Sequence, residues 1–333
     1  MTAPGAGPSG EDALIARYFR PLATDPGAFG LLDDAAILKP SRDDLVLKTD
    51  AIVEGVHFLS DDPPEAVARK ALRRNLSDLA AKGAAPAGFL LTLALREADE
   101  AWLTPFARGL GEDARQYGCP LLGGETVSTP GPIMVSISAF GHVPPGSIVH
   151  RSGARPGDRI AVTGTIGDAA LGLDIIRGGA AASVLADNAG AREMLVGRYR
   201  VPQPRNSLAK AVRDHASAAI DVSDGLAGDL AKLCAASGVS AAIDVASIPL
   251  SAAAAAVLAR RAVGIEALVS GGDDYEILCA IPESRFDAFA EAAGLAGVAV
   301  SSIGIVISGA SEPKFLDAQG RDVPLAHLAY SHF

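Results

Sequence analysis

The sequence predicts two domains in which β-strands and α-helices alternate. The chain has 333 residues, which is longer than a single hydrophobic core usually serves. Hydrophobic residues make up 49% of it, enough for two packed cores. The stretch Pro144-Pro145-Gly146 is the strongest linker signal in the chain. We therefore expect a first domain over residues 11–148 and a second over residues 149–333.

In the first half, longer periodic stretches predict helices and short apolar stretches predict strands. A helix opens at Pro63-Pro64, runs to about Lys82 and ends at Gly83, which suits a helix cap. Another helix opens at Thr104-Pro105, with a capping residue and a first-turn proline, and extends to Tyr117. The other expected elements are a helix at 11–19 and strands at 35–38, 47–50, 89–95, 121–126 and 133–143.

The second half continues the alternation of strands and helices. Apolar stretches predict strands at 159–163, 218–220, 277–281 and 298–306. One helix is expected to begin at about Asp168, and another follows the segment Asp221–Leu226 and runs to about Ser237. Further helices are expected at 192–199, 207–215, 251–261 and 285–293.

Composition and charge exclude several classes of function. With 29 basic and 39 acidic residues, the net charge of −10 argues against a nucleic-acid-binding surface. No apolar run is long enough to cross a bilayer, so no membrane partner is expected. Three cysteines stand far apart without a CxxC pair, which predicts reduced, buried thiols and a cytoplasmic location. Residues 1–10 are small, polar and rich in Pro and Gly, which predicts a disordered leader rather than a signal peptide.

Carboxylates recur at the ends of predicted strands and in glycine turns. The strand at Leu47 closes on Thr49-Asp50, and the next loop carries Glu54 and His57. A carboxylate at a strand end is well placed to hold a metal, because the strand fixes it while the loop exposes it. An aspartate that only caps a turn is the alternative.

Two further pairs of polar residues extend this pattern. Asp33 and Asp34 are adjacent, so on an extended backbone they face opposite ways and serve different partners. Solvated surface acids are the alternative for both. Asn75 and Asp78 are three residues apart on one face of a predicted helix, where both are poor helix formers. This mismatch favours a ligand role for Asp78 over a solvated charge.

The remaining acids stand beside glycine or a hydroxyl residue. Gly123 and Gly124 precede Glu125 and allow close approach of the backbone to a ligand, unless this is an ordinary strand-end turn. Asp224 suffices as a helix cap, which leaves Asp221 without a structural task. The acids that share the pattern are Asp33, Asp34, Asp50, Asp78, Glu125, Asp221, Asp224, Asp273 and Asp274.

So many converging carboxylates would repel one another unless cations lay between them. Oxygen-rich sites suit Mg²⁺, which bridges carboxylates to phosphate oxygens. The sequence has no GxxxxGK[ST] loop, no GxGxxG fingerprint at a strand–helix turn, no kinase HRD or DFG set and no HExxH. Any nucleotide must therefore be held by metals, glycine turns and a few basic groups. Phosphoryl transfer is a reaction that such a metal cluster can largely drive by positioning and charge neutralisation.

The motifs together resemble the thiamine-monophosphate kinase family. This family belongs to the superfamily of aminoimidazole ribonucleotide synthetase and selenophosphate synthetase. The resemblance covers nearly the whole chain in the same order, including the ending Tyr-x-His-Phe. It is carried by the segments Leu31–Ala36, Thr49–Phe58, Asn75–Ala84, Gly123–Thr126, Arg151–Asp158, Asp221–Gly225 and Ser270–Glu276.

The resemblance implies a fold, an assembly and a reaction. The fold is that of aminoimidazole ribonucleotide synthetase, with an N-terminal α/β domain that binds ATP and Mg²⁺ and a C-terminal α+β domain. The assembly is a homodimer formed through the N-terminal sheets. The reaction is direct, in-line, Mg²⁺-dependent phosphorylation of thiamine monophosphate by ATP, with no phosphoenzyme and no general base assigned.

The resemblance also implies roles for individual residues. The metal ligands it implies are Asp34, Thr49, Asp50, Asp78, Glu125, Asp221 and Asp224. The implied ATP contacts are Gly124, Glu125, Arg151 and Ser223. The implied contacts to thiamine monophosphate are His57, Asp273 and Tyr330.

Three positions depart from the family pattern. Lys48 stands where the family usually has a small hydroxyl residue, Glu125 where it usually has Asp, and Leu32 where it often has Gly. None removes the main cluster, so we expect an active enzyme. The alternatives are another ATP-using enzyme of the same superfamily and a catalytically silent nucleotide-binding regulator.

Overall fold

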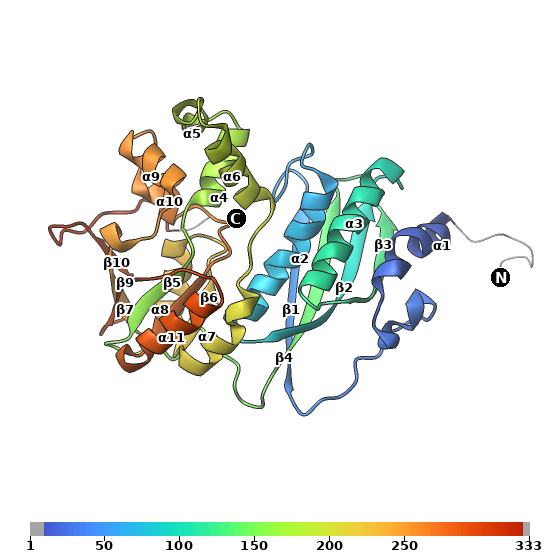
Figure 1. Cartoon of the computed structure of the whole chain (residues 1–333), viewed down its shortest axis with the longest axis horizontal. Coiled ribbons are helices and arrows are strands. Elements are labelled where there is room, and N and C mark those ends of the chain that lie inside the picture. The colour runs from blue at the N-terminus through green and yellow to red at the C-terminus, as the bar shows by residue number, and fades with distance from the viewer. Residues whose placement is uncertain (1–9, 329–333) are drawn as a thin grey trace, which may run out of the picture. The chain divides into compact units, whose positions relative to one another are not determined.

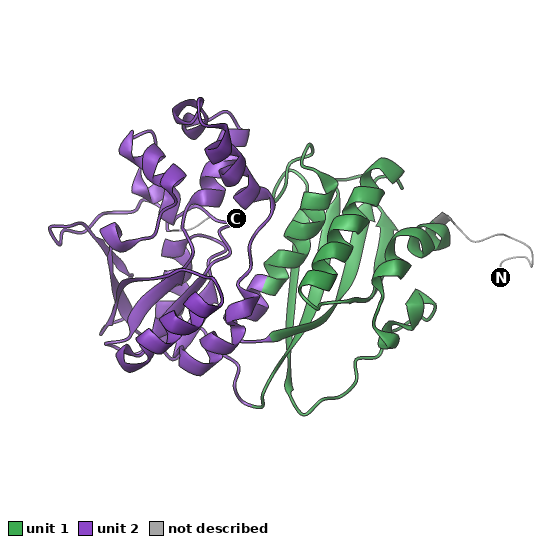
Figure 2. Ribbon diagram, in the orientation of Figure 1, with its two compact units in different colours: residues 1–76, 85–145 green, residues 77–84, 146–333 purple. Residues whose placement is uncertain are grey.

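The chain forms two compact units in the computed structural model, which describes residues 10–328 (Figures 1 and 2). Unit 1 contains the described residues up to Leu76 together with Ala85–Pro145. Unit 2 contains Ser77–Ala84 together with the described residues from Gly146. One helix, α2 (Pro64–Ala81), contributes its first part to unit 1 and its last residues to unit 2.

Unit 1 is built on a four-stranded sheet in the order β1-β4-β2-β3. Strands β2 and β3 are parallel, and the other neighbouring strands are antiparallel. The strands are β1 (Asp44–Val53), β2 (Ala85–Leu95), β3 (Leu121–Ser128) and β4 (Met134–Val143). Helices α2 and α3 (Glu100–Gln116) lie against one face of this sheet (Figure 1).

The two faces of the unit 1 sheet differ in how deeply their side chains are buried, as strand β4 shows. Val135, Ile137 and Ala139 are fully buried, whereas the alternating Ser136 and Ser138 are only partly covered. Because successive side chains of a strand point to opposite faces, one face is covered and the other is more open. We call the less covered face, to which Ser136 and Ser138 point, the open face. Short helical turns precede the sheet: α1 (Gly10–Leu14), the π-helical η1 (Ile15–Phe19), and the 3₁₀ turns η2 (Arg20–Leu22) and η3 (Pro26–Leu31).

Unit 2 is built on a six-stranded sheet in the order β10-β7-β9-β5-β8-β6. Strands β7 and β10 are parallel, and the other neighbouring pairs are antiparallel. The strands are β5 (Arg159–Thr163), β6 (Ala218–Asp221), β7 (Ser240–Asp244), β8 (Ile277–Ile281), β9 (Val300–Ile307) and β10 (Lys314–Leu316).

Helices cover both faces of the unit 2 sheet. On one face, α8 (Leu226–Ser237) packs into a core with alternate residues of β5, β6 and β8. On the other, α7 (Ala209–His215), α11 (Glu283–Leu295) and the last turn of α2 pack against the intervening residues. A separate apolar cluster joins α4 (Asp168–Ile176), α5 (Ala180–Val184), α6 (Ala189–Arg200), α9 (Ala252–Ala259) and α10 (Ile265–Val269). The remaining 3₁₀ turns are η4 (Asn206–Leu208) and η5 (Val245–Ser247).

Several predicted elements differ from the structure. The strand expected at 35–38 is a loop, tied by Ile37 N–H to the carbonyl of Gly27 at 2.8 Å instead of to a strand. Helix α3 begins at Glu100, because the Asp99 side chain accepts a hydrogen bond from Ala101 N and caps it there. Pro105 therefore lies inside the helix and not in its first turn. Strands β7 and β10 and the short helices α5 and α10 were not predicted.

Two local expectations, the glycine that ends α2 and the buried thiols, are confirmed. Gly83 follows α2 with a φ of +73°, the left-handed conformation expected of a helix-ending glycine. The three cysteines Cys119, Cys234 and Cys279 are free and buried, and burial raises the pKa of their thiols. Within residues 10–328, none of the helices combines the length and apolar character needed to cross a membrane.

Candidate functional site

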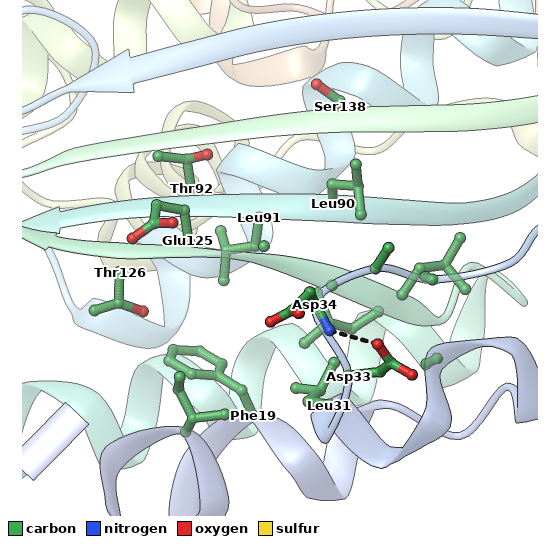
Figure 3. Close-up of a pocket in the computed structure, with 18 of the residues that line it drawn as sticks. Phe19, Leu31, Asp33, Asp34, Leu90, Leu91, Thr92, Glu125, Thr126 and Ser138 are labelled. Carbon is green, nitrogen blue, oxygen red and sulfur yellow. Dashed lines mark hydrogen bonds between the residues drawn. The ribbon is translucent and has the colours of Figure 1, made fainter. Parts of the chain in front are cut away.

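A pocket of about 870 Å³ lies in unit 1, between the loop at 33–38 and the open face of the sheet (Figure 3). Its lining combines polar and apolar side chains. Glu125 and Thr92 come from neighbouring parallel strands and are paired in register, so both side chains reach the pocket. Asp34 enters from the loop, while Phe19 and Leu31 supply apolar surface. The structure thus brings the predicted residues Asp34, Gly124 and Glu125 to one pocket.

The paired acids at the start of this loop are both exposed and both line the pocket. The Asp33 carboxylate accepts a hydrogen bond from the backbone N–H of Asp34 at 2.8 Å. This bond uses one oxygen of Asp33 to shape the loop (Figure 3).

Gly124 is required by the packing of two strands. A Cβ at this position would lie 1.9 Å from the carbonyl oxygen of Leu91 in β2. Strand β3 continues to Ser128, so Glu125 lies within the strand and not at its end. The prediction that this strand ends at its acid was therefore wrong, and the close approach that Gly124 allows is to β2.

Thr49 and Asp50 lie on opposite faces of the sheet. The Thr49 hydroxyl donates to the carbonyl of Ile137 at 3.2 Å and accepts from Ser138, which lines the pocket. Asp50 is on the helix-covered face, where its carboxylate is 3.2 Å from the ammonium group of Lys48. Strand β1 runs on to Val53, so the expected strand end at Asp50 was wrong.

His57 lies in the turn that follows β1. Its Nδ1 accepts a hydrogen bond from the backbone N–H of Val53 at 3.1 Å. Glu54 holds the same turn: it accepts from Arg96 at 2.5 Å and from Ile133 N at 3.0 Å. The hydrogen bond from Arg96 lowers the pKa of the Glu54 carboxyl. Glu54 is thus a structural acid that positions the loop carrying His57.

In unit 2, Lys82 lies near three of the predicted residues. Its ammonium group donates to the carbonyl of Ala219 at 2.6 Å. Burial lowers the pKa of Lys82 to about 8, and the nearby guanidinium of Arg151 adds to the effect. The carboxylates of Asp221 and Asp78 act in the opposite direction. Asp78, Asp221 and Arg151 are therefore within electrostatic reach of one buried ammonium group.

Asp221 ends β6 and is buried at 2% exposure. Its carboxylate accepts a hydrogen bond from the hydroxyl of Ser77 at 2.9 Å. Ser77 belongs to the same helical segment as Asp78, so the last turns of α2 supply both a partner for Asp221 and a second carboxylate. The reason for a serine at position 77 was not recognised in the sequence.

Asp229 organises the loop between β6 and α8. Its Oδ2 accepts from the backbone N–H groups of Ser223 and Asp224, each at 2.9 Å. Lys232 donates to Asp229 Oδ1 at 2.9 Å and also pairs with Asp224. Helix α8 begins after Gly225, so the expectation that Asp224 caps it was wrong. An aspartate in the first turn of the helix was the sequence signal for this role.

A second turn, at 270–276, is bonded to that loop. The N–H of Asp273 donates to the carbonyl of Ser223 at 2.9 Å, and the N–H of Tyr275 donates to the carbonyl of Val222 at 2.8 Å. Gly272 is necessary here, because a Cβ would lie 2.6 Å from the Ser223 carbonyl oxygen. The structure therefore brings the predicted residues Ser223 and Asp273 together.

The two acids after Asp273 have structural partners. Asp274 is buried and accepts from the N–H groups of Gly167 and Ala169 at the start of α4, at 2.8 and 3.3 Å. Burial raises the pKa of this carboxyl to about 8. Glu276 is fully buried and accepts from Arg198 at 2.8 Å and from the Nε of Arg205 at 2.6 Å. Neither of these arginines was singled out from the sequence.

The predicted metal ligands are divided between the units. Asp34, Thr49, Asp50 and Glu125 belong to unit 1, and Asp78, Asp221 and Asp224 belong to unit 2. Among residues 10–328, no group of three or more His, Cys, Asp or Glu side chains is placed to hold a metal ion. Tyr330, the predicted substrate contact near the C-terminus, lies outside the described residues.

Comparisons with known proteins identify both parts of the chain. Residues 32–143 match the family described as AIR synthase related protein, N-terminal domain, and residues 155–313 match its C-terminal domain. A thiamine-monophosphate kinase from Caulobacter vibrioides is 47% identical and aligns over 99% of this chain and 93% of its own length.

Solved structures agree with this identification. The crystal structure of thiamine-monophosphate kinase from Stenotrophomonas maltophilia matches with a TM-score of 0.82 at 36% identity, over 94% of this chain and 98% of that one. A structure described as AaThiL complexed with AMPPCP and TMP matches with a TM-score of 0.75 at 30% identity, over 92% and 97%. The predicted fold, α/β followed by α+β, is confirmed. The chain belongs to the thiamine-monophosphate kinase family of AIR synthase related proteins.

Proposed function

We propose that this chain transfers a phosphoryl group from ATP to thiamine monophosphate, forming thiamine diphosphate and ADP. The similarity to a thiamine-monophosphate kinase, 47% identity over almost the whole chain, is the observation that carries this proposal. A related structure contains AMPPCP and TMP, which correspond to the two substrates. The acid-lined pocket of unit 1 and the paired turns of unit 2 supply polar groups suited to phosphorylated ligands.

We further propose that the acids bind several Mg²⁺ ions. The donor set fits this ion, because all its members are carboxylate or hydroxyl oxygens. Lys48 and Lys232 pair with Asp50 and Asp224, so these carboxylates already attract cations. When bound, Mg²⁺ would screen the repulsion between ATP and an anionic acceptor. The proposed ligands are Asp34, Thr49, Asp50, Asp78, Glu125, Asp221 and Asp224.

The protein groups would then hold and orient the two substrates. Arg151 offers a planar fork of donors to phosphate oxygens. We propose Gly124, Glu125 and Ser223 as further ATP contacts. His57, Asp273 and Tyr330 are proposed to contact thiamine monophosphate. The acceptor phosphate is largely ionised at neutral pH, so direct in-line transfer needs no strong general base and no phosphoenzyme.

We propose that two copies of the chain form a homodimer through the open face of unit 1. Leu45 and Leu47 of β1, Leu90 of β2 and Val127 of β3 are exposed apolar residues. Apolar residues gathered on one face of a sheet are typical of an interaction site. Light scattering should give twice the chain mass for the wild type and the chain mass for Leu47→Glu. A monomeric wild type would reject this assembly.

We also propose that the enzyme works in the cytoplasm. Its three cysteines are free and buried, as expected in a reducing compartment. Cell fractionation with an antibody to the chain would test this location, and recovery in the membrane or secreted fraction would contradict it.

The reaction is tested by incubating the protein with ATP, thiamine monophosphate and Mg²⁺ and measuring both products. Thiamine diphosphate and ADP should appear one-for-one, and product should be lost without metal and in Asp50→Asn. Asp43→Asn changes an exposed acid outside the proposed site and should retain activity. ATP binding without product would favour a silent regulator or a different acceptor. Absence of ATP binding would refute the assignment.

A further inference from the structure

The turn that carries Asp273 contains two residues in an unusual backbone conformation. Asp273 has a φ of +70° and Tyr275 a φ of +52°. A left-handed conformation is uncommon for Asp and rare for a bulky residue such as Tyr. Such conformations persist only where the surrounding structure enforces them, and they concentrate at functional sites.

Contacts on both sides of the turn enforce this conformation. The backbone N–H groups of Asp273 and Tyr275 are bonded to the loop that follows β6. Between them, the Asp274 carboxylate is bonded to the first residues of α4. The turn ends at Glu276, whose buried carboxylate holds two arginine side chains. Each residue from 273 to 276 is therefore held in place by a hydrogen bond to another part of unit 2.

The strained turn brings the phenol of Tyr275 back onto Asp273. The Tyr275 hydroxyl donates to Asp273 Oδ1 at 2.8 Å. Tyr275 is 1% exposed, so its ring is packed and its hydroxyl is a donor with a fixed position. A hydrogen bond from a fixed donor to one carboxylate oxygen sets the direction of the whole carboxylate. The strained backbone of this turn therefore serves to orient the Asp273 carboxylate.

We propose that Tyr275 is a positioning residue for thiamine monophosphate, acting through Asp273; this inference rests on the proposed function. The thiazolium ring of this substrate carries a permanent positive charge, for which an oriented carboxylate is a suitable partner. Pre-organised groups bind more tightly because less freedom is lost when the ligand arrives. Tyr275 therefore contributes to the affinity for thiamine monophosphate and not to that for ATP.

Tyr275→Phe tests the proposal, because it removes the hydroxyl and retains the packed ring. We expect the Kd and the KM for thiamine monophosphate to rise about five- to tenfold, the size of the net contribution of one ordinary hydrogen bond. The kcat, the KM for ATP and the Tm should stay close to wild type. Tyr117→Phe, at the end of α3 where the ring contacts Arg73, is the matched control and should change neither affinity.

A double-mutant cycle with Asp273→Asn separates positioning from packing. If Tyr275 acts through Asp273, the Phe substitution should have little further effect on the Kd in the Asn background. Equal effects in both backgrounds would overturn the proposal. A parallel rise in both KM values with a lower Tm would show a purely structural role and would also overturn it.

The Kd for thiamine monophosphate, measured by calorimetry without ATP, distinguishes this inference from the proposed function. If the wild type binds thiamine monophosphate without converting it, the proposed reaction fails while the comparison of Kd values still decides the role of Tyr275. A wild type that does not bind thiamine monophosphate refutes both.

Discussion

Asp229 is the residue whose loss should most disturb the loop that carries Asp221, Ser223 and Asp224. In Asp229→Ala, the backbone N–H groups of Ser223 and Asp224 lose their acceptor. An unsatisfied buried donor costs about 1–3 kcal/mol. Taking about 1.5 kcal/mol for each gives about 3 kcal/mol. Water can reach the partly exposed Asp224 and replace part of this loss.

The burial of the Asp229 carboxylate reduces the expected loss of stability. Burial raises the pKa of Asp229 despite the hydrogen bond from Lys232, so removing the carboxylate also relieves a desolvation cost. We therefore expect Asp229→Ala to lower the free energy of unfolding by about 2–3 kcal/mol. Asp229→Asn retains an oxygen that can accept both N–H groups, and it should cost about 1 kcal/mol.

Urea unfolding followed by circular dichroism measures these differences. Asp244→Ala is the matched control, because Asp244 accepts a backbone hydrogen bond from Ala246 N at an exposed position. The Asp244→Ala substitution should lower the free energy of unfolding by less than about 1 kcal/mol. Hydrogen exchange should also become faster at the amides of Ser223 and Asp224 in Asp229→Ala alone. If Asp229→Ala loses no more stability than the control, or if exchange at these amides is unchanged, the organising role of Asp229 is refuted.

Two predictions concern other charged groups. Lys48→Ser should tighten Mg²⁺ binding about threefold, because it removes a cation that competes for Asp50; calorimetric titration checks this, and weaker binding would contradict it. Asp274 has a pKa raised to about 8 in the folded chain from about 3.8, so the folded state holds a proton that the unfolded state releases. Wild-type stability should therefore fall relative to Asp274→Asn as pH rises from about 4 to about 8, and a constant difference in unfolding free energy would contradict this pKa.

The main elements of the fold follow from local sequence patterns. The apolar stripe of α2 and its glycine stop, and the alternating apolar residues of β4, are properties of short segments. Other elements depend on distant partners. Strand β10 has three residues and pairs with β7, far away in the chain, so its own sequence carries little signal. The loop at 35–38 has a strand-like apolar sequence, but Ala35, Ala36 and Leu38 line the pocket instead of pairing with a strand.

The sequence pattern selected acids for the candidate site, but it did not predict their positions within the strands. Position along a strand was misjudged for Asp50 and Glu125, because both strands continue past the polar residue. The roles of Glu276 and Asp229 depend on contacts with Arg198, Arg205 and the loop after β6. Contacts between residues distant in the sequence are not visible in a single chain without its fold.

Neighbouring acids repel one another unless cations lie between them. In the part of the chain that the structure describes, lysines supply several of these cations. Lys48 pairs with Asp50, and Lys232 pairs with Asp224 and Asp229. Repulsion alone therefore does not require one metal ion for each pair of acids. A bound Mg²⁺ must instead compete with an ammonium group that is already in place, and metal affinity should depend on these lysines as well as on the acids.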